Sequence, residues 1–185
     1  MKQFRVYLRA LEYDDYKATH KWHSDSEIVQ GYGAIKHFVS TENEKKWIEH
    51  MIFSKDKVAA GICLKETNEL IGLVFLTEID LFNKTGHCPT FIGEKKYWGE
   101  GYATEARILI LKYAFYDRGL QRVSDIINED NIASQKMVEK CGYQKEGLMR
   151  KSAFKDGQFV NQYMYAILKE EFDKLLEDKY KDYEF

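Results

Sequence analysis

The chain has 185 residues, 44% of them hydrophobic and 31% charged, so it is long enough to form one domain with a substantial core. Its 28 Lys and Arg residues nearly balance its 30 Asp and Glu residues, and the net charge of -2 argues against a nucleic-acid-binding protein. No apolar run approaches the roughly 20 residues of a membrane helix, and the first residues show no signal-peptide pattern. Cys63, Cys88 and Cys141 are too few for a disulfide framework, and no ligand spacing indicates a metal site. We therefore expect a single cytoplasmic domain, residues 1–185, with reduced thiols and no metal.

Hydrophobic periodicity and turn residues predict, for the first half of the chain, a strand, two helices and a β-hairpin. These elements are the strand 4–10, the helices 13–23 and 41–53, and the strands 57–65 and 70–77. Residues 24–39 contain two glycines and are predicted to form a loop. Ser40 or Thr41 is expected to begin the second helix, with Glu44 placed for a capping box.

The second half begins with a short strand that starts near Gly86 and ends at Gly93, and it continues with alternating helices and strands. The predicted elements are the helix 101–118, the strand 122–127, the helix 132–140, the strands 143–151 and 159–168, and a terminal helix from Lys169. Gly119 and Gly142 stand where helix C-caps belong. The order predicts a mixed α/β chain whose early strands are antiparallel and whose second half contains a βαβα unit.

A glycine-rich turn joins the short strand to the clearest helix of the chain. Gly99 and Gly101 allow positive φ and a close approach of the backbone to a ligand. The N–H groups of residues 102–104 begin the helix without intrahelical partners, so they attract an anion. A P-loop needs Lys and then Ser or Thr after its last glycine, and a dinucleotide fingerprint needs glycine at position 104, so neither motif is present. A pyrophosphate-binding turn and an ordinary capping loop both remain open.

The run YWGEGYATEA, followed by NEDNIASQKMVEKCGYQKEG, resembles the GNAT superfamily of acetyl-CoA-dependent N-acetyltransferases. The similarity is greatest to the RimJ/RimL type, which acetylates the N-termini of ribosomal proteins. It covers nearly the whole chain, from LRALEYDDY to NQYMYAILKEEF. It implies an α+β fold with a mostly antiparallel, splayed central sheet flanked by helices, and acetyl-CoA as the co-substrate.

The resemblance also implies where coenzyme A binds. The family's [QR]-x-x-G-x-[GA] turn, which holds the pyrophosphate, corresponds to Lys96, Gly99 and Gly101, with Lys in place of Gln or Arg. The preceding strand is expected to splay from its neighbour and pair with the pantetheine arm, and Pro89 suits such an edge. The implied cofactor-binding residues are Phe91, Ile92, Gly93, Lys96, Trp98, Gly99, Glu100, Gly101, Tyr102, Ala103, Thr104, Asn131 and Ser134.

Acetyl transfer from a thioester to an amine requires a neutral amine and a proton for the leaving thiolate. Many relatives carry a glutamate base on the splayed strand; His87 stands at that position, and its ordinary pKa of about 6.5 suits a base at neutral pH. Glu78, at the end of the preceding strand, is the alternative base. Val138 occupies the position of the family's tyrosine acid, so Ser134, which the resemblance places near the sulfur, is the candidate proton donor. Asn131 and Ser134 also suit the cap of the helix that they begin.

The acceptor is expected to bind between the loop after the first helix and the closing hairpin, near the ring side chains of Trp22, His23, Tyr32 and His37. Asn161 stands where many relatives have an acidic residue, which removes one anchor for an ammonium group. A protein N-terminus, an amino sugar, a polyamine and an aminoglycoside all remain open as acceptors.

We expect direct transfer in a ternary complex, without an acyl-enzyme on Cys88. The competing hypothesis is a non-catalytic acetyl-CoA-binding module, because Val138 and His87 stand where many relatives have the catalytic Tyr and Glu. An open edge strand is compatible with a homodimer. No nucleic-acid or membrane partner is expected.

Overall fold

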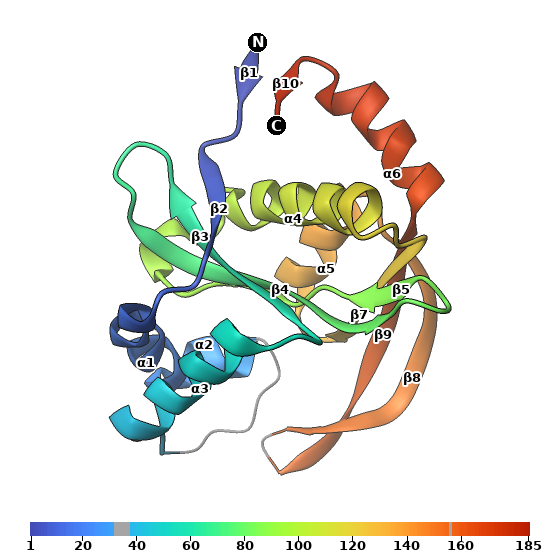
Figure 1. Cartoon of the computed structure of the whole chain (residues 1–185). Helices are drawn as coiled ribbons and strands as arrows, with labels where there is room; N and C mark the ends of the chain where they lie inside the picture. Colours follow the sequence, from blue (N-terminus) through green and yellow to red (C-terminus); the bar gives the residue numbers. More distant parts are fainter. Residues whose placement is uncertain (32–37, 156) are drawn as a thin grey trace.

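The structure is a computed structural model that describes residues 1–31, 38–155 and 157–185 (Figure 1). Its strands are β1 (Lys2–Gln3), β2 (Val6–Ala10), β3 (Val58–Leu64), β4 (Leu70–Asp80), β5 (Thr85–His87), β6 (Thr90–Ile92), β7 (Arg122–Asn128), β8 (Gln144–Lys155), β9 (Gln158–Leu168) and β10 (Tyr183–Glu184). Its α-helices are α1 (Tyr16–Ser24), α2 (Ser26–Gly31), α3 (Thr41–Phe53), α4 (Tyr102–Lys112), α5 (Ile132–Lys140) and α6 (Lys169–Leu175). Shorter helical turns are η1 (Tyr13–Asp15) and η2 (Lys95–Tyr97), together with the π-helical η3 (Tyr113–Asp117) and η4 (Leu176–Tyr180).

The main sheet has the strand order β2-β3-β4-β5-β7-β9-β8, and β6 pairs with β4. The pairs are antiparallel except for β5 with β7, which run parallel. The prediction of a mixed, mostly antiparallel α+β sheet is therefore confirmed. A separate parallel pair of β1 with β10, which the sequence did not predict, brings the two ends of the described chain side by side (Figure 1).

The sheet splits at the strand that the sequence predicts as one element. β5 pairs with β7, with His87 opposite Ser124, whereas β6 pairs with β4 and with no other described strand. The last bond across the split runs from the N–H of Cys88 to the carbonyl oxygen of Ser124 at 3.3 Å. Pro89 follows directly and has no N–H to continue the ladder, which explains why the strand divides here.

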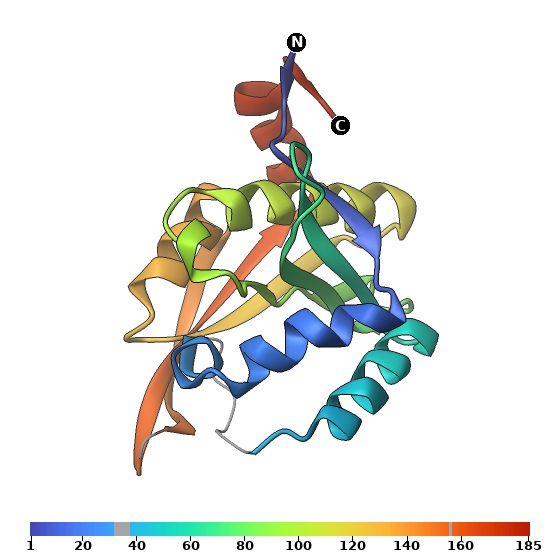
Figure 2. The same ribbon diagram turned by 90° about the vertical axis from the view of Figure 1, so that its left-hand side faces the viewer.

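Helices cover both faces of the sheet. Figures 1 and 2 show α4 on one side of the strands and α1 with α3 on the other. The α4 side holds the larger core, to which Ile108, Leu111 and Phe172 belong. On the opposite side, Trp22 of α1 and Ile48 of α3 pack with Leu73 of β4. No described helix is both long and apolar enough to cross a lipid bilayer.

The predicted loop 24–39 is corrected by the structure, because α2 forms within it and residues 32–37 lie outside the described chain. The side chain of Asp25 accepts the N–H groups of Glu27 and Ile28 at 3.0 and 3.4 Å and so caps this helix, which is too short to show a helical period. The capping box of α3 is corrected as well. Ser40 caps the helix by accepting the N–H of Asn43 at 3.2 Å, but Glu44 points inward and is buried.

Candidate active site

The turn before α4 presents an uninterrupted series of unpaired backbone amides. Gly99 and Gly101 have φ of 79° and 87°, and α4 begins directly afterwards at Tyr102. The first helical bond runs from Glu105 N–H to Gly101 O at 3.1 Å, and the N–H groups of residues 99–104 donate to no described residue. Together with the positive end of the helix dipole, these donors form a concave anion site of the kind that binds phosphate groups. The predicted cofactor turn therefore presents a set of free backbone donors, and the binding of a pyrophosphate there stays a prediction.

Arg5 braces this turn from the outside, and sequence reasoning missed it. Its backbone N–H and its Nε donate to the two carboxylate oxygens of Glu105 at 2.7 and 2.6 Å. Its Nη2 donates to the carbonyl oxygen of Glu100 at 2.8 Å, and its guanidinium lies 4.2 Å from the ring centroid of Tyr102. About a hundred residues separate these partners in the chain, so no local pattern marked the contact.

The other predicted residues of the turn are held by neighbouring side chains. Lys96 forms an ion pair with Glu69 on the β3–β4 turn at 2.8 Å, and this contact raises the pKa of Lys96 above its usual value. The indole N–H of Trp98 donates to the carbonyl oxygen of Ile92 at 2.8 Å. Trp98 therefore ties the turn to the end of β6, while the ammonium of Lys96 is engaged away from the amide series.

The backbone of β6 offers hydrogen-bonding groups to the gap opposite β7. Phe91 lies opposite Leu73 of β4, and Gly93 N–H donates to Ile71 O at 2.8 Å. Because bonding directions alternate along an antiparallel strand, the N–H groups of Thr90 and Ile92 face the gap instead. Thr90, which the sequence analysis did not name, thus joins Ile92 in presenting a backbone N–H to the gap.

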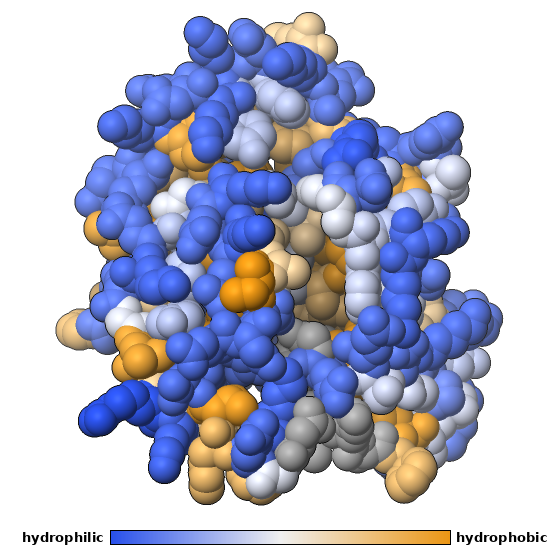
Figure 3. Space-filling view, turned by 180° about the vertical axis from the view of Figure 1, so that it is seen from behind, coloured by the Kyte–Doolittle hydropathy of each residue, from blue (hydrophilic) through white to orange (hydrophobic). Residues whose placement is uncertain are grey.

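Glycine is required at position 93 because of side-chain packing, not because of the gap between β6 and β7. A Cβ built at this position would lie 2.0 Å from Cδ2 of Trp22, so no larger residue fits without displacing the indole. Trp22 is buried and donates its indole N–H to Glu94 at 3.0 Å, and Phe91 packs edge-to-face against it with ring centroids 6.1 Å apart. The face that lies behind in Figure 1 is hollowed near its centre, with hydrophobic side chains at the floor (Figure 3).

The two alternative bases of the sequence analysis, His87 and Glu78, are neighbours. Nε2 of His87 lies 3.5 Å from Oε2 of Glu78 and 3.3 Å from Oγ of Ser124. The His87 side chain is 29% exposed and that of Glu78 is 75% exposed, so the carboxylate is open to solvent. Glu78 has φ of 49° at an irregularity between β4 and β5, which turns it toward His87. Ser124 was missed, since only the parallel β5–β7 register brings it next to His87.

α5 begins a few residues after the end of β7, the strand on the other side of the gap from β6. The side chain of Asn131 accepts the N–H of Ser134 at 3.1 Å, as the predicted N-cap requires. The Ser134 side chain is half-buried, and Val138, one turn further on, is completely buried in the core. Val138 therefore faces the core, and this position supplies no proton donor.

Burial makes Cys88 a poor nucleophile. Its side chain is completely buried, and this burial raises the pKa of the thiol to about 11, so it stays protonated at neutral pH. The described residues hold no disulfide, and Cys63 and Cys141 are also buried. Nothing in this environment favours an acyl-enzyme on a cysteine.

On the opposite side of the sheet, His23 binds a buried carboxylate. Nδ1 of His23 lies 2.9 Å from Oε1 of Glu44, which also accepts the hydroxyl of Thr19 at 2.5 Å. The His23 ring packs edge-to-face against Trp47 with centroids 4.7 Å apart. Tyr32 and His37, which were grouped with it, lie outside the described residues.

Asn161 lies next to an acidic side chain. Its amide nitrogen donates to Glu129, which follows β7, at 3.0 Å, and the hydroxyl of Tyr163 donates to the other oxygen of that carboxylate at 3.0 Å. The early acidic residues Asp25 and Glu27 are both paired with Lys95. The single ammonium of Lys95 thereby offsets one of these two negative charges.

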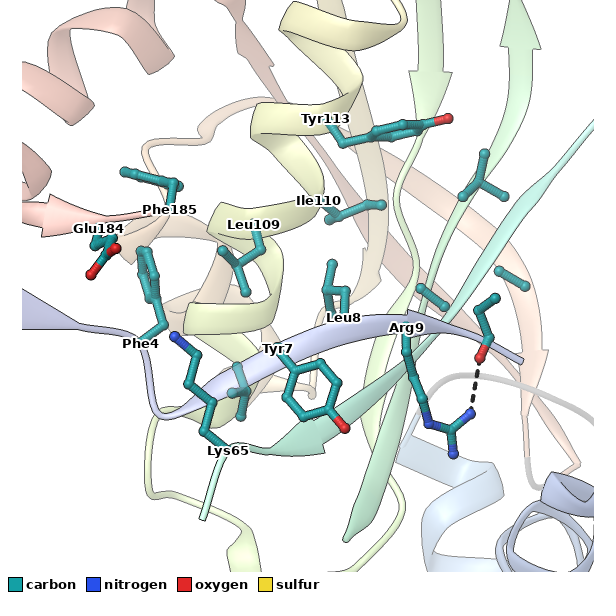
Figure 4. A pocket seen from close by; sticks show the side chains of 15 residues that line it. Phe4, Tyr7, Leu8, Arg9, Lys65, Leu109, Ile110, Tyr113, Glu184 and Phe185 are labelled. Atoms are coloured by element: carbon teal, nitrogen blue, oxygen red, sulfur yellow. Dashed lines mark hydrogen bonds between the residues drawn. The ribbon is translucent and has the colours of Figure 1, made fainter. Parts of the chain in front are cut away.

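A pocket of about 530 Å³ lies elsewhere, between the outer edge of β2 and α4 (Figure 4). Leu8, Leu109, Ile110 and Phe185 line it, and Figure 4 shows Arg9 pointing to the other side of β2. None of the predicted catalytic or cofactor-binding residues lines it.

Comparison with known proteins agrees with this geometry. A family model described as an acetyltransferase (GNAT) domain matches residues 5–144. The chain is 28% identical over 171 residues to the uncharacterized N-acetyltransferase p20 of Bacillus licheniformis, covering 91% of this chain and 95% of that protein. It is 23% identical over 167 residues to spermidine N(1)-acetyltransferase of Escherichia coli K12, covering 90% and 88%.

Solved structures share the fold. Spermidine N-acetyltransferase from Vibrio cholerae, in complex with CoA and spermine, matches with a TM-score of 0.84 and 21% identity, covering 91% of this chain and 98% of that one. A GNAT-family acetyltransferase from Bacillus anthracis matches with a TM-score of 0.78 and 26% identity, covering 92% and 98%.

Proposed function

Since the chain belongs to the GNAT family and is an acetyl-CoA-dependent N-acetyltransferase, we propose that it acetylates a polyamine, with His87 as the base. The observation that carries the cofactor part of the proposal is the series of unpaired amides at residues 99–104, next to the split between β6 and β7. This donor set suits a pyrophosphate, since it combines several N–H groups with a helix N-terminus. When bound, acetyl-CoA supplies the acetyl thioester.

In this proposal the protein groups along the gap orient the co-substrate. The amides of residues 99–104 hold its phosphates, and the Thr90 and Ile92 backbone groups that face the gap bind the amide-containing arm. Arg5 and Trp98 hold the turn in place by binding Glu100 and Ile92. The arm then extends from the turn toward Cys88, whose N–H bonds to Ser124 of β7, and so toward the neighbouring His87.

The proposed chemistry is one direct transfer. An alkylammonium group has a pKa of about 10, so it must lose a proton before its nitrogen attacks. His87 Nε2 takes this proton, directly or through a water molecule, and Glu78, 3.5 Å away, stabilises the resulting imidazolium. The new N–C bond forms and the C–S bond breaks. The nitrogen releases its second proton to water, and the Ser134 hydroxyl donates its proton to the departing sulfur and regains one from that water. The protonated Cys88 thiol supports transfer without an acyl-enzyme.

The polyamine proposal rests on two observations. Relatives with a named substrate include spermidine N(1)-acetyltransferase, and the Glu78 carboxylate lies open to solvent beside His87, where it attracts a cationic amine. A neutral or anionic acceptor gains nothing from that charge.

The test measures release of free CoA from acetyl-CoA with spermidine, spermine, peptide N-termini, amino sugars and aminoglycosides. We expect turnover with the polyamines, and mass spectrometry should show one added acetyl group. Turnover with only another class of amine would contradict the polyamine proposal but would still support acetyltransferase activity. Tight acetyl-CoA binding without turnover on any amine would favour the non-catalytic module instead.

A further inference from the structure

An ion pair lies buried beneath the point where the sheet splits. Arg107 of α4 is 2% exposed and Asp125 of β7 is 8% exposed. Nη1 of Arg107 donates to the Asp125 carboxylate and, at 3.1 Å, approaches the hydroxyl of Tyr143, which follows α5. The pair therefore joins α4, β7 and the segment after α5 at one point in the core.

Stability alone does not account for this pair. Moving two charges out of water carries a large desolvation penalty, and well-packed hydrophobic residues of similar volume are often as stable or more stable. Nε of Arg107 is also buried and donates to no described residue, which adds a further penalty. Burial opposes the charge on Arg107, but the Asp125 carboxylate together with the neighbouring Cys88, Tyr143 and Cys141 side chains outweighs it and keeps the pKa of Arg107 well above its ordinary value. The ion pair therefore carries a free-energy penalty, and a property other than stability must explain its presence.

The location of the pair indicates that property. Arg107 is on the helix α4, whose first three residues, 102–104, belong to the series of free amides. Asp125 follows Ser124, which lies opposite His87 in the β5–β7 register and within 3.3 Å of its Nε2. Beyond the Cys88–Ser124 bond, β6 has no described pairing with β7, so no sheet ladder fixes the width of the gap there. An ion pair with fixed bonding directions defines the spacing of α4 and β7 more sharply than apolar contact does.

We propose that Arg107 and Asp125 are positioning residues that set the spacing between the cofactor-binding end of α4 and the β5–β7 pair that carries His87. This inference rests on the proposed function for its catalytic consequence. Rate is sensitive to such spacing, since a misplacement of about 1 Å can lower a rate about a hundredfold. The groups proposed to bind coenzyme A lie on the turn, on α4 and on β6, and none of them lies on β5 or β7. Affinity for CoA should therefore depend little on the spacing between α4 and the β5–β7 pair.

The test is the double variant Arg107→Met with Asp125→Leu, which keeps the volume of the core and removes both charges together. We expect a thermal midpoint close to that of the wild type. We expect a Kd for CoA within about twofold of the wild type, and a kcat about 10- to 100-fold lower. In hydrogen exchange, the amides of residues 86–88, 90 and 123–126 should exchange faster while those in the rest of the sheet do not change.

The control removes another ion pair from β7. Arg122 binds Glu146 of β8 and has no link to α4, so Arg122→Gln with Glu146→Gln should leave kcat, CoA affinity and the exchange of residues 86–88 and 90 unchanged. Tyr143→Phe, which removes one anchor of the guanidinium and keeps the ring, should lower kcat in the same direction by a smaller factor.

A stable double variant with wild-type kcat and wild-type exchange would overturn the inference. If the wild type turns over no amine, the proposed function fails, and the exchange of residues 86–88, 90 and 123–126 still decides this inference. If the double variant does not fold, Tyr143→Phe decides by the same readouts, and its failure to change kcat or local exchange would contradict the positioning role.

Discussion

At the scale of single residues, two glycines of the candidate site have different constraints, and a matched pair of alanine variants separates them. Gly93→Ala places a Cβ 2.0 Å from the Trp22 indole, so we expect a loss of about 1–3 kcal/mol in the free energy of unfolding. Gly99→Ala meets no atom within 4 Å but must adopt φ near 79°, which costs about 1 kcal/mol. Because its methyl group would stand where phosphate oxygens approach the backbone, Gly99→Ala should also weaken CoA binding about tenfold or more.

Urea denaturation and calorimetric titration with CoA measure these two effects separately. Gly93→Ala should change mainly the unfolding midpoint, and Gly99→Ala mainly the Kd for CoA. If Gly99→Ala bound CoA as tightly as the wild type, the phosphate site would have to lie elsewhere.

The neighbouring side chains His87 and Glu78 have distinct expected roles. His87→Ala removes the proton acceptor and should lower kcat/KM for the amine about 10²- to 10⁴-fold. Glu78→Gln keeps the size of the side chain and removes its charge, so it should reduce activity by a smaller factor and mainly raise KM for a cationic amine. Steady-state kinetics with CoA affinity as the control measures both. The opposite ranking, with Glu78→Gln the more damaging, would make Glu78 the base.

At the scale of elements, the turn before α4 depends on β2 through Arg5. Arg5→Ala removes the side-chain bonds to Glu105 and Glu100 and the contact with the Tyr102 ring, and it keeps only the backbone N–H bond to Glu105. The turn then loses its outer support, so we expect the Kd for CoA to rise several-fold while the helices and sheet keep their structure. Arg5→Lys retains the charge but not the planar fork, and should restore little of the affinity.

Calorimetry of CoA binding and far-ultraviolet circular dichroism together check this prediction. An unchanged Kd in Arg5→Ala would show that the turn holds its shape without β2. A fall in helix content would indicate a general loss of structure instead.

The elements themselves show what the sequence predicts and what it does not. The α4 helix with its glycine turn and the α5 helix with its Asn131 cap follow from local spacing, and both are present. The strand 86–93 was predicted as one piece, because its division depends on which neighbours β5 and β6 choose, and pairing is not local. Ser124, Arg5 and the Arg107–Asp125 pair were missed for the same reason, since each acquires its role from a partner far along the chain.

At the scale of the whole molecule, the two ends of the described chain help to close the core. Phe4, just after β1, packs against the rings of Tyr180 and Tyr183 with centroids 5.9 and 4.9 Å apart. Tyr116, after α4, donates to Asp173 of α6 at 2.7 Å and so links the last helix to the same core. Tyr116 must keep its proton to donate to Asp173, and Tyr165 of the larger core must keep its proton to donate to Glu139. The free energy of unfolding therefore depends on pH in the alkaline range.

Tyrosine ionisation should therefore destabilise the fold between about pH 10 and pH 12. Burial raises the pKa of Tyr165 to about 12, and the hydrogen bond to Asp173 raises that of Tyr116 to about 12. The ordinary value in an unfolded chain is about 10. Because the folded pKa is the higher one, the contribution is complete below pH 10 and is lost as pH rises through the folded pKa. For the fully buried Tyr165, two pKa units correspond to about 2–3 kcal/mol.

Tyr165→Phe isolates one of these groups, because it removes the ionisable hydroxyl and keeps the buried ring. At pH 8 the variant should be about 1 kcal/mol less stable, since the hydrogen bond from Tyr165 to Glu139 at 3.0 Å is lost. Between pH 10 and 12 its free energy of unfolding, measured in urea, should fall less steeply than that of the wild type, so the two curves converge. Parallel curves over this range would mean that Tyr165 ionises as readily in the folded chain as in the unfolded one.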